Sequence, residues 1–312
     1  MIVVTGGAGF IGSNLIEALN QSGVSDILVV DTFSRSKEAN VACLSVRDCI
    51  DKHEFRKRVS TNQLRHLAID VIYHFGACTS TTECDATYLM DNNYLYSKEL
   101  LHFSIENRSR FIYASSAAVY GGSSRFREQP EYEKPLNLYG ISKLMIDNYV
   151  RQLFPAVDIG VVGLRLFNVY GPREAHKGVM SSMVHQCIMQ AKTSGIVRIF
   201  GKSHGYGDGE QRRDFVYVAD AVRASLYFGR RPVAVRGIYN VGTGRSRTFN
   251  DIARCVIRAV GRGRLEYIDF PASLSGKYQS STEADVSLLA SVGCKPPSIS
   301  LEEGVQSTVE MS

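Results

Sequence analysis

The sequence lacks any hydrophobic run long enough to cross a membrane, although 44% of its 312 residues are hydrophobic. The apolar stretch that follows Met1 covers residues 2–4 and ends at Thr5 and a group of glycines. A membrane helix needs about 20 apolar residues, and the core of a secretory signal needs about 7 to 15. We therefore expect a cytoplasmic protein that has no membrane partner.

Paired metal-binding side chains are also missing from the sequence. The seven cysteines are scattered and form no C-x-x-C motif, which is typical of reduced thiols in a reducing compartment. The seven histidines include no pair at helical spacing, so zinc and related metals lack a recognisable ligand set. We expect neither a disulfide framework nor a metal site.

No run of like charges stands out either. The net charge of +5 is modest and the Lys and Arg residues are spread along the chain, which argues against nucleic acid as a partner. An anionic small molecule suits this charge better. The chain has no repeat or low-complexity tract, and its length allows one large α/β domain and a smaller one.

Three glycines near the start of the chain, Gly6, Gly9 and Gly12, form a G-x-x-G-x-x-G pattern between an apolar run and an amphipathic segment. The pattern is typical of a dinucleotide-binding turn, because glycines let the backbone approach a pyrophosphate and the next helix directs its partly positive N-terminus at the phosphates. Asp31 ends a second apolar run, where its carboxylate could accept a hydrogen bond from the adenosine ribose. A plain tight turn is the alternative, and the strand, helix and acid around the glycines count against it.

Short apolar segments alternate with amphipathic segments through the first half of the chain. We expect strands at 2–5, 27–31, 71–74, 111–114 and 159–165, and helices at 11–22, 52–66, 86–107 and 138–154. This alternation predicts an α/β fold with a doubly wound parallel sheet of the Rossmann type, covered by helices on both faces. Further helices are expected at 179–191, 219–228, 249–260 and 301–309. We therefore predict a Rossmann domain at 1–166 and a smaller, mostly helical substrate lobe at 167–312, with the chain crossing back to the first domain.

Tyr139 and Lys143 lie one helical turn apart, so their side chains share a face of the expected helix. A tyrosine with the usual pKa of about 10 is a poor base at neutral pH, but a nearby cation favours its ionised form. Ser115 and Ser116 directly follow an expected strand, and a hydroxyl there could bind the reacting oxygen of a substrate. Because Tyr-x-x-x-Lys is common in ordinary helices, its weight comes from the serines and glycines that accompany it.

Together these residues resemble the NAD-dependent epimerase/dehydratase family of the extended short-chain dehydrogenase/reductase superfamily. The resemblance covers nearly the whole chain. It implies a catalytic set of Ser116, Tyr139 and Lys143, in which Tyr139 is the acid–base group and Lys143 binds the nicotinamide ribose.

Residues 165–178 make the resemblance more specific. With residues 77–83, 90–94, 131–137 and 213–218, they are similar to the epimerases that invert C6 of an ADP-linked heptose. The resemblance implies conversion of ADP-D-glycero-D-manno-heptose to its L-glycero epimer, for the inner core of lipopolysaccharide, by transient oxidation and re-reduction. Inversion requires proton transfer in two substrate poses, and the resemblance assigns the second acid–base role to Lys177.

The resemblance also implies binding positions. Those for the cofactor, besides Lys143 and Lys177, are Gly6, Gly9, Phe10, Ile11, Gly12, Asp31, Thr32, Lys37, Lys52, Phe75, Gly76, Ala77, Cys78, Thr79, Asn92 and Val169. Those for the ADP-sugar, besides Ser116, are Asn168, Val179, Gln186, Phe200, Gly201, Lys202, Ser203, Arg213 and Tyr278. Asp31 alone favours NAD, whereas Lys37 and Lys52 align with the family's contacts to the extra phosphate of NADP, which we expect as the cofactor. The family further implies a homo-oligomer, specifically a homopentamer.

Several positions depart from the family pattern. Gln186 stands where a histidine is expected, Phe75 replaces an acidic residue, and the glycine-rich loop 204–211 is longer. These changes leave the contacts to the ADP-sugar open. We interpret the loop as a flexible lid and Arg213 as a clamp for the diphosphate.

Two other functions stay open at this point. Another nucleotide-sugar epimerase, such as a UDP-glucose 4-epimerase, would share the Ser, Tyr and Lys set but would not need Lys177. A non-catalytic sensor of NADP would need neither the Ser, Tyr and Lys set nor Lys177. A 4,6-dehydratase is disfavoured because Ala117 and Ala118 follow Ser116, where a dehydratase has an acidic pair.

Overall fold

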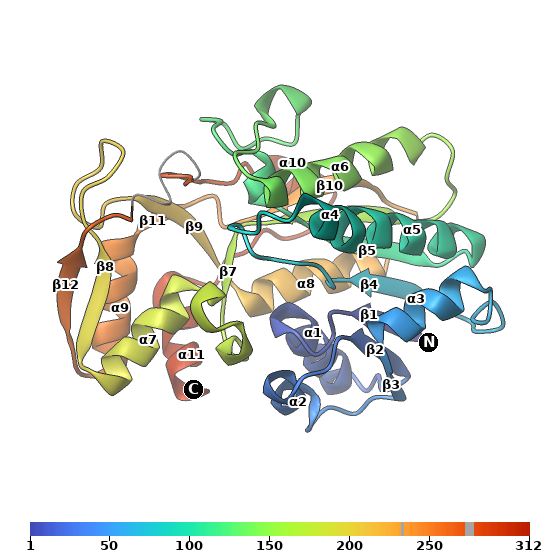
Figure 1. Ribbon diagram of the computed structural model, residues 1–312, viewed down its shortest axis with the longest axis horizontal. Coiled ribbons are helices and arrows are strands. Elements are labelled where there is room, and N and C mark those ends of the chain that lie inside the picture. The colour runs from blue at the N-terminus through green and yellow to red at the C-terminus, as the bar shows by residue number, and fades with distance from the viewer. Residues whose placement is uncertain (232–233, 272–277) are drawn as a thin grey trace.

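The computed structural model describes residues 1–231, 234–271 and 278–312, and its largest sheet has seven parallel strands (Figure 1). Their order across the sheet is β10-β6-β5-β4-β1-β2-β3. The strands are β1 (Ile2–Thr5), β2 (Ile27–Asp31), β3 (Asp48–Asp51), β4 (Val71–His74), β5 (Arg110–Ser116), β6 (Val161–Leu166) and β10 (Arg236–Val241). The order reverses between β1 and β4, which is where a doubly wound sheet binds its ligand, beyond the carboxyl ends of the strands.

Helices cover both faces of this sheet, so the predicted doubly wound α/β fold is confirmed. Neighbouring residues of β1 point into two separate cores: Val4 packs with α1 (Phe10–Gln21) and α8 (Val218–Gly229), and Val3 packs on the opposite face. The opposite face is covered by α3 (Lys52–Ser60), α5 (Tyr96–Glu106) and α6 (Leu138–Leu153). Burial on both faces explains why these strands are apolar throughout rather than alternating.

The first half differs from the expected elements at three places. A helix α2 (Arg35–Val41) and the edge strand β3 were not predicted, because both are short and polar. The helix expected at 52–66 ends at Ser60, since Asn62 adopts a positive φ of 58° that a helix does not allow. The helix expected at 86–107 is divided into α4 (Ala86–Leu89), a π-helical segment (Met90–Leu95) and α5.

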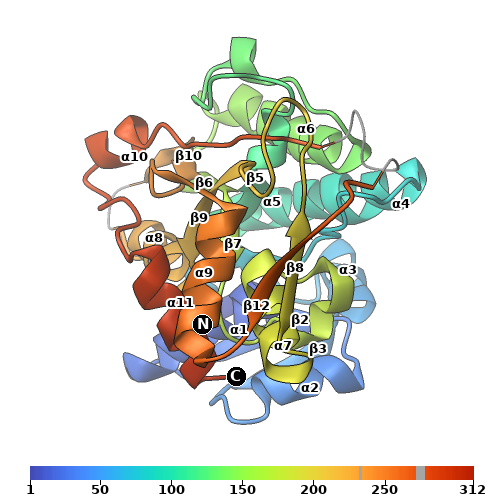
Figure 2. The ribbon, with the colours of Figure 1, turned by 90° about the vertical axis from the view of Figure 1, so that its left-hand side faces the viewer.

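The second half contains more strands than the sequence predicted. A three-stranded sheet has the order β11-β9-β7, and a parallel pair joins β12 to β8. These strands are β7 (Asn168–Tyr170), β8 (Ile196–Phe200), β9 (Arg212–Tyr217), β11 (Ser246–Thr248) and β12 (Arg264–Ile268). The helices are α7 (Met183–Thr193), α9 (Phe249–Val260), α10 (Ser287–Ser291) and α11 (Leu301–Glu310). Figure 2 shows α9 running beside α7, α11 and the β8–β12 pair.

The helix expected at 179–191 begins four residues later, at Met183. Ser182 is its N-cap and accepts a hydrogen bond from the backbone N–H of His185. Gly178, just upstream, has a φ of 52°, and the chain at Ala175–Met180 is a short 3₁₀ segment. Val179 therefore lies in this 3₁₀ segment and not in α7.

The second half also contributes a strand to the seven-stranded sheet. Strand β10 pairs in parallel with β6.

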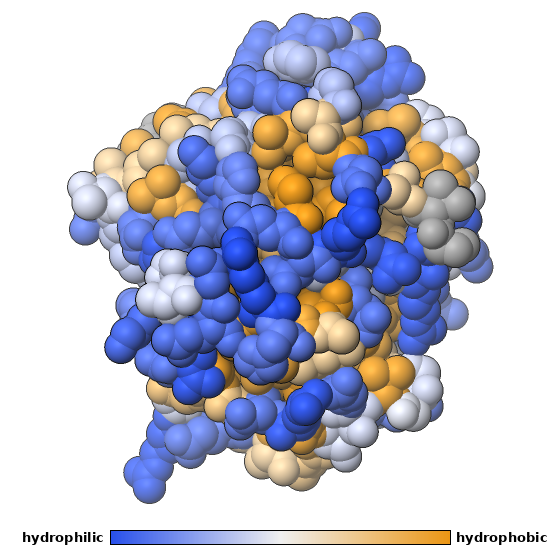
Figure 3. Space-filling model, turned by 90° about the vertical axis from the view of Figure 1, so that its right-hand side faces the viewer, coloured by the Kyte–Doolittle hydropathy of each residue, from blue (hydrophilic) through white to orange (hydrophobic). Residues whose placement is uncertain are grey.

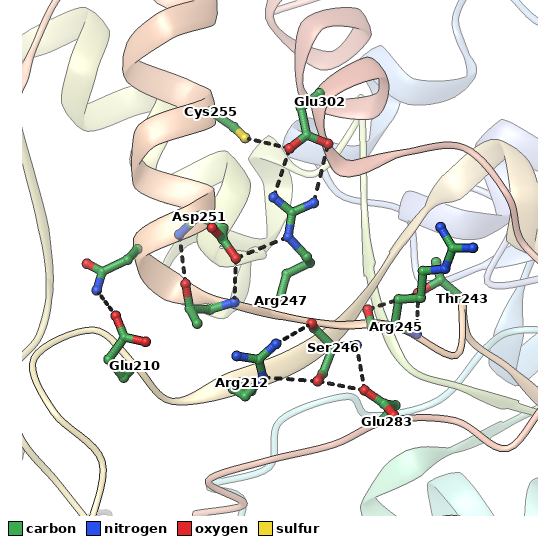
Figure 4. Close-up of polar contacts among 12 residues, drawn as sticks. Glu210, Arg212, Thr243, Arg245, Ser246, Arg247, Asp251, Cys255, Glu283 and Glu302 are labelled. Carbon is green, nitrogen blue, oxygen red and sulfur yellow. Dashed lines mark hydrogen bonds and ion pairs between the residues drawn. The ribbon is translucent and has the colours of Figure 1, made fainter.

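Ion pairs connect several elements of the second half. In Figure 4, Arg247 of β11 contacts Glu302 of α11 at 2.8 Å and Asp251 of α9 at 3.0 Å. Arg247 thereby joins one strand to the two helices that pack on it.

Figure 3 shows the side of the molecule on the right of Figure 1, where hydrophilic residues cover most of the surface and apolar residues form separate groups. Scattered exposed apolar groups are usual on a folded protein. In the part of the chain that the structure describes, every helix is too short or too polar to span a bilayer.

Candidate active site

The glycine turn between β1 and α1 packs tightly against the end of β4. Gly6 has a φ of 67°, and a Cβ there would lie 2.6 Å from the backbone nitrogen of Gly76. A Cβ at Gly12 would collide with the carbonyl oxygen of Gly6. These positions exclude any side chain, so the turn exposes backbone at the N-terminus of α1, as binding of a pyrophosphate requires.

Asp31, at the end of β2, is buried and holds this turn. Its carboxylate accepts hydrogen bonds from the backbone N–H of Ala8 at 3.0 Å and of Thr32 at 2.7 Å. It also pairs with the Lys37 ammonium at 2.6 Å. Lys37 is therefore fixed beside the turn, at the place where a ribose or its phosphate would meet Asp31.

Lys52 supplies a second cation near this position. It begins α3 and donates a hydrogen bond of 2.7 Å to the side chain of Asn92. Burial lowers the pKa of Lys52, and the neighbouring charge of Arg56 adds to this shift. The glycine turn, Asp31 and the two lysines together fit a dinucleotide and leave a positive charge for a further phosphate.

The segment that follows β4 carries five predicted cofactor positions, and two buried side chains that sequence reasoning missed hold it in place. The backbone N–H of Cys78 donates to the Asn93 side chain at 2.8 Å, and that amide in turn reaches Ser142 at 3.0 Å. His74 bridges Thr5 and Ser97, at 2.6 and 2.8 Å. Burial lowers the pKa of His74 to about 3, so it stays neutral and has a structural role.

The predicted catalytic set comes together where β5 ends and α6 begins. Asn137 caps α6 by accepting a hydrogen bond of 2.8 Å from the backbone N–H of Gly140, which orients Tyr139 at the start of the helix. Burial raises the pKa of Tyr139, and a hydrogen bond with Ser116 opposes the shift. The Lys143 ammonium donates to the carbonyl oxygen of Ala114 at 2.8 Å.

Lys143 is buried, and burial lowers its pKa to about 8 while the negative charge of Asp147 opposes the shift. At neutral pH the side chain is therefore charged and close to Tyr139. A cation in this position favours the phenolate and allows Tyr139 to act as a base.

Lys177 lies beside the start of α1, where its ammonium is 5.2 Å from the centre of the Phe10 ring. Its ammonium is 3.5 Å from the carboxylate of Glu174. Glu174 is fully buried and also accepts hydrogen bonds from the backbone N–H of Gly171 at 3.1 Å and of Ser182 at 2.7 Å. The loop that carries Lys177 is thus tied at both ends. Among the described residues, the polar contacts of Lys177 include Glu174 but not Tyr139.

Arg213 of β9 is the most distinctive of the predicted substrate positions. It is buried, and its guanidinium stacks on the ring of Tyr278 at 4.6 Å and on that of Phe249 at 5.7 Å. Within the described ranges it pairs with no carboxylate, and burial lowers its pKa. A buried cation without an acidic partner is well suited to an anionic ligand such as a diphosphate.

Aromatic rings gather beside Arg213. Phe270 packs edge-on against Phe200 at 5.3 Å and against Tyr278 at 5.2 Å, and His204 lies 6.2 Å from Tyr278 in a stacked orientation. Phe200 and Tyr278 were predicted from the sequence, whereas His204 and Phe270 were missed as single residues. Flat rings beside a buried cation form a surface on which a nucleobase could stack.

The base of loop 204–211 is held by hydrogen bonds. The Gln211 amide donates to the carbonyl oxygen of Gly201 and to the Ser203 hydroxyl, both at 2.8 Å. The backbone N–H of Lys202 donates to the Asp208 carboxylate at 2.9 Å. Three predicted substrate positions are thereby fixed beside Arg213, and the lid function of the loop stays a prediction.

The remaining predicted positions differ in exposure and in their contacts. Val179 is 89% exposed, and Asn168 is exposed at the start of β7. Gln186 uses its amide to hold the carbonyl oxygens of Val179 and Ser181, at 3.1 and 2.9 Å. Of the cofactor positions, Ile11, Phe75, Ala77 and Val169 are half-buried, and Thr32 and Thr79 are exposed.

Comparison with known proteins identifies a matching family and named relatives. The model of the NAD dependent epimerase/dehydratase family matches residues 2–242, which include every strand of the seven-stranded sheet. A protein of Alkalilimnicola ehrlichii named ADP-L-glycero-D-manno-heptose-6-epimerase is 50% identical over 311 residues, which cover 99% of this chain and 97% of that protein.

Two solved structures extend the comparison. The ADP-L-glycero-D-manno-heptose-6-epimerase of Helicobacter pylori has a TM-score of 0.85 and 30% identity, over 99% of this chain and 94% of its own. The UDP-glucose 4-epimerase of Thermus thermophilus, solved as a complex with NAD, has a TM-score of 0.81 and 26% identity, over 99% and 98%.

Proposed function

The chain belongs to the NAD dependent epimerase/dehydratase family, and we propose that it inverts C6 of the heptose in ADP-D-glycero-D-manno-heptose. The product, ADP-L-glycero-D-manno-heptose, serves the inner core of lipopolysaccharide. The observation that carries the proposal is the 50% identity, across the substrate lobe as well as the sheet, to an epimerase named for this sugar. The chain is therefore an isomerase that works with a nicotinamide cofactor.

The chemistry starts from the C6 carbinol of the sugar. Its C–H bond is not acidified by a neighbouring carbonyl, so removal of a proton from carbon would be too slow. A nicotinamide coenzyme held by the glycine turn, Asp31 and Lys143 would supply reversible hydride transfer at this carbon. Tyr139 removes the hydroxyl proton as the ketone forms, and Ser116 holds the oxygen.

Inversion requires that the ketone turn and receive the hydrogen on its other face. The oxygen then lies away from Tyr139 and needs another proton donor. Lys177, which lies over the ring of Phe10 and pairs with Glu174, takes this role. A UDP-glucose 4-epimerase, which would share Ser116, Tyr139 and Lys143, has no need for such a second group.

The sugar nucleotide is held in the second lobe. Arg213 binds the diphosphate, and the rings of Phe200, His204, Phe270 and Tyr278 bind the adenine. This assignment rests on the burial of the Arg213 charge and on the packing of the rings around it.

The substrate is tested by incubating the purified protein with ADP-D-glycero-D-manno-heptose and, separately, with UDP-glucose. Proton NMR should show a new C6 signal from the heptose and no change in UDP-glucose. Conversion of UDP-glucose alone would assign the chain to the 4-epimerases.

The cofactor is NADP rather than NAD, because Lys37 and Lys52 supply two cations beside Asp31. Replacing both with Gln should weaken NADPH binding by about tenfold or more, since a charged hydrogen bond contributes about 1.5 to 3 kcal/mol. The affinity for NADH should change little. Fluorescence titration with both coenzymes measures the ratio, and Lys57→Gln, at an exposed position of α3, is the matched control. Equal loss for NADPH and NADH would contradict the assignment.

The activity should fall at alkaline pH. The pKa of Lys143 lies near 8, below its usual value, so its ammonium is charged below that pH and neutral above it. Without the charge, the Tyr139 phenolate loses its support. We expect kcat/KM, which reports groups of the free enzyme, to decrease above about pH 8. Circular dichroism over the same range separates this limb from unfolding, and a profile that stays flat to pH 10 would exclude the role of Lys143.

Three further expectations remain predictions. These are the homopentamer, the cytoplasmic location and the boundary between the two lobes near residue 166.

A further inference from the structure

Asp147 lies one turn beyond Lys143 on α6 and is completely buried. One carboxylate oxygen accepts a hydrogen bond from the Tyr113 hydroxyl at 2.9 Å, and the other accepts one from the Ser115 hydroxyl at 2.9 Å. Tyr113 and Ser115 are alternate residues of β5, so both side chains face the helix. A single carboxylate thereby attaches α6 to two points of the strand.

These two points are adjacent to the residues of β5 that meet the catalytic set. Ala114, between them, accepts the hydrogen bond from Lys143 at 2.8 Å. Ser116, the next residue of the strand, contacts Tyr139. The distances among Ser116, Tyr139 and Lys143 therefore depend on how α6 is placed along β5, and Asp147 sets that placement.

Asp147 belongs to a buried cluster of charged side chains. Arg165 of β6 is fully buried and donates to Asp147 at 2.9 Å. The same guanidinium contacts Glu133 at 2.5 Å, and Arg151 contacts Glu133 at 2.5 Å. Two cations and two anions thus balance one another beneath the catalytic set, and none of them was predicted as a functional residue.

Three titratable groups interact electrostatically with Lys143 from the elements around it. They are Asp147 on α6, Cys78 after β4, and His74 on β4. Tyr139, one turn before Lys143, shares its face of α6. Asp147 is the only carboxylate among these groups, burial keeps His74 neutral, and the charge of Asp147 is the largest influence that opposes the lowering of the Lys143 pKa by burial.

We propose that Asp147 is a positioning residue of the epimerase: it places α6 on β5 and thereby holds Lys143 against the carbonyl oxygen of Ala114. This proposal rests on the proposed function only in the roles of Lys143, which supports Tyr139 and binds the nicotinamide ribose. Asp147 touches neither the sugar nor the coenzyme and acts through Lys143.

Asp147→Asn removes the charge and retains the shape of the side chain. The alkaline limb of kcat/KM should move about one pH unit lower, because an opposite charge at short range shifts a pKa by about one to three. At pH 7.5, kcat/KM should fall about threefold, because the charged fraction of Lys143 falls from about three quarters to about one quarter. The affinity for NADPH should also weaken as the pH rises, and in Asp147→Asn this weakening should begin about one pH unit lower than in the wild-type protein. This last measurement needs no sugar, so it tests Asp147 even if the wild-type protein does not convert ADP-heptose.

Companion variants separate charge from placement. Tyr113→Phe with Ser115→Ala keeps every charge and removes two hydrogen bonds, so kcat should fall while the alkaline limb stays in place. Asp147→Glu restores the charge and should restore the limb. Asp220→Asn is the matched control, because Asp220 is equally buried on α8 and is hydrogen-bonded to the backbone N–H groups of Ser298 and Ile299. It should lower the melting temperature without moving either pH profile.

The outcomes decide between positioning and general stability. The proposal is supported if Asp147→Asn moves the alkaline limb of both kcat/KM and NADPH binding to lower pH and Asp220→Asn does not. An unmoved limb in Asp147→Asn overturns it, even if activity is lost. Should Asp147→Asn fail to fold, the double variant decides, since unchanged kcat in Tyr113→Phe with Ser115→Ala overturns the role in placement. Loss of ADP-heptose turnover in the wild-type protein would refute the proposed function and leave the NADPH result valid.

Discussion

Tyr139→Phe is expected to lower kcat by about 10² to 10⁴, because it removes the only oxygen of that side chain that can take the C6 hydroxyl proton. The ring remains, so the packing at the start of α6 and the affinity for NADPH should be nearly unchanged. Steady-state kinetics by NMR and NADPH fluorescence measure the two effects. The separation of a large loss in rate from a small change in binding identifies an acid–base group.

The matched control lies on the same helix. Tyr149→Phe removes a phenol hydroxyl that contacts His102 at the surface, and it should retain normal turnover. If Tyr139→Phe also kept full turnover while NADPH bound, the acid–base role of Tyr139 would be refuted.

Lys177→Met should produce a loss of similar size, about 10² to 10⁴ in kcat, because the ketone that has turned would have no proton donor on its second face. Methionine is similar in length to lysine and can pack on the ring of Phe10, which the Lys177 ammonium contacts at 5.2 Å. The binding of ADP-heptose, followed by calorimetry, should therefore persist. A partial reaction that stops after oxidation should leave NADPH absorbance on the enzyme.

Glu174 complicates this variant, since its buried carboxylate would lose one partner and keep its bonds to Gly171 and Ser182. The melting temperature must be measured beside the rate. Lys57→Met, at an exposed site, controls for the loss of a charge. Near-normal turnover in Lys177→Met with an intact fold would show that the second acid–base group lies elsewhere.

Local patterns were enough to predict five of the seven strands of the large sheet; β3 and β10 were missed. The strands at 2–5, 27–31 and 71–74 are short, apolar and followed by glycine or helical segments, so their type and their bounds were predicted correctly. The strands of the second lobe gave no such signal. Strand β9 buries Arg213 and Asp214 in tertiary contacts, and β8 alternates apolar residues with an exposed Arg198. A strand whose charged side chains are satisfied by distant partners is not visible from its own sequence.

The candidate site likewise contains residues that local patterns predict and residues that only the folded structure brings together. Tyr139 and Lys143 are one turn apart on a helix, so helical geometry alone places them together. Ser116 reaches this set from the end of β5, and the resemblance to a known family, rather than local geometry, indicated it. The pairing of Arg165 with Asp147 and Glu133 joins three elements, and no local pattern announces it. His204 and Phe270 likewise join the rings beside Arg213 only after the second lobe has folded.

The most direct test of the account is the fate of the C6 hydrogen during turnover in heavy water. ADP-D-glycero-D-manno-heptose is converted to equilibrium by the purified protein in D₂O with catalytic NADP, and proton NMR and mass spectrometry follow both epimers. Return of the same hydrogen to the opposite face of C6 predicts that the product carries no deuterium there. Incorporation of deuterium at C6 in step with epimerisation would contradict it, because the hydrogen would then have exchanged with solvent.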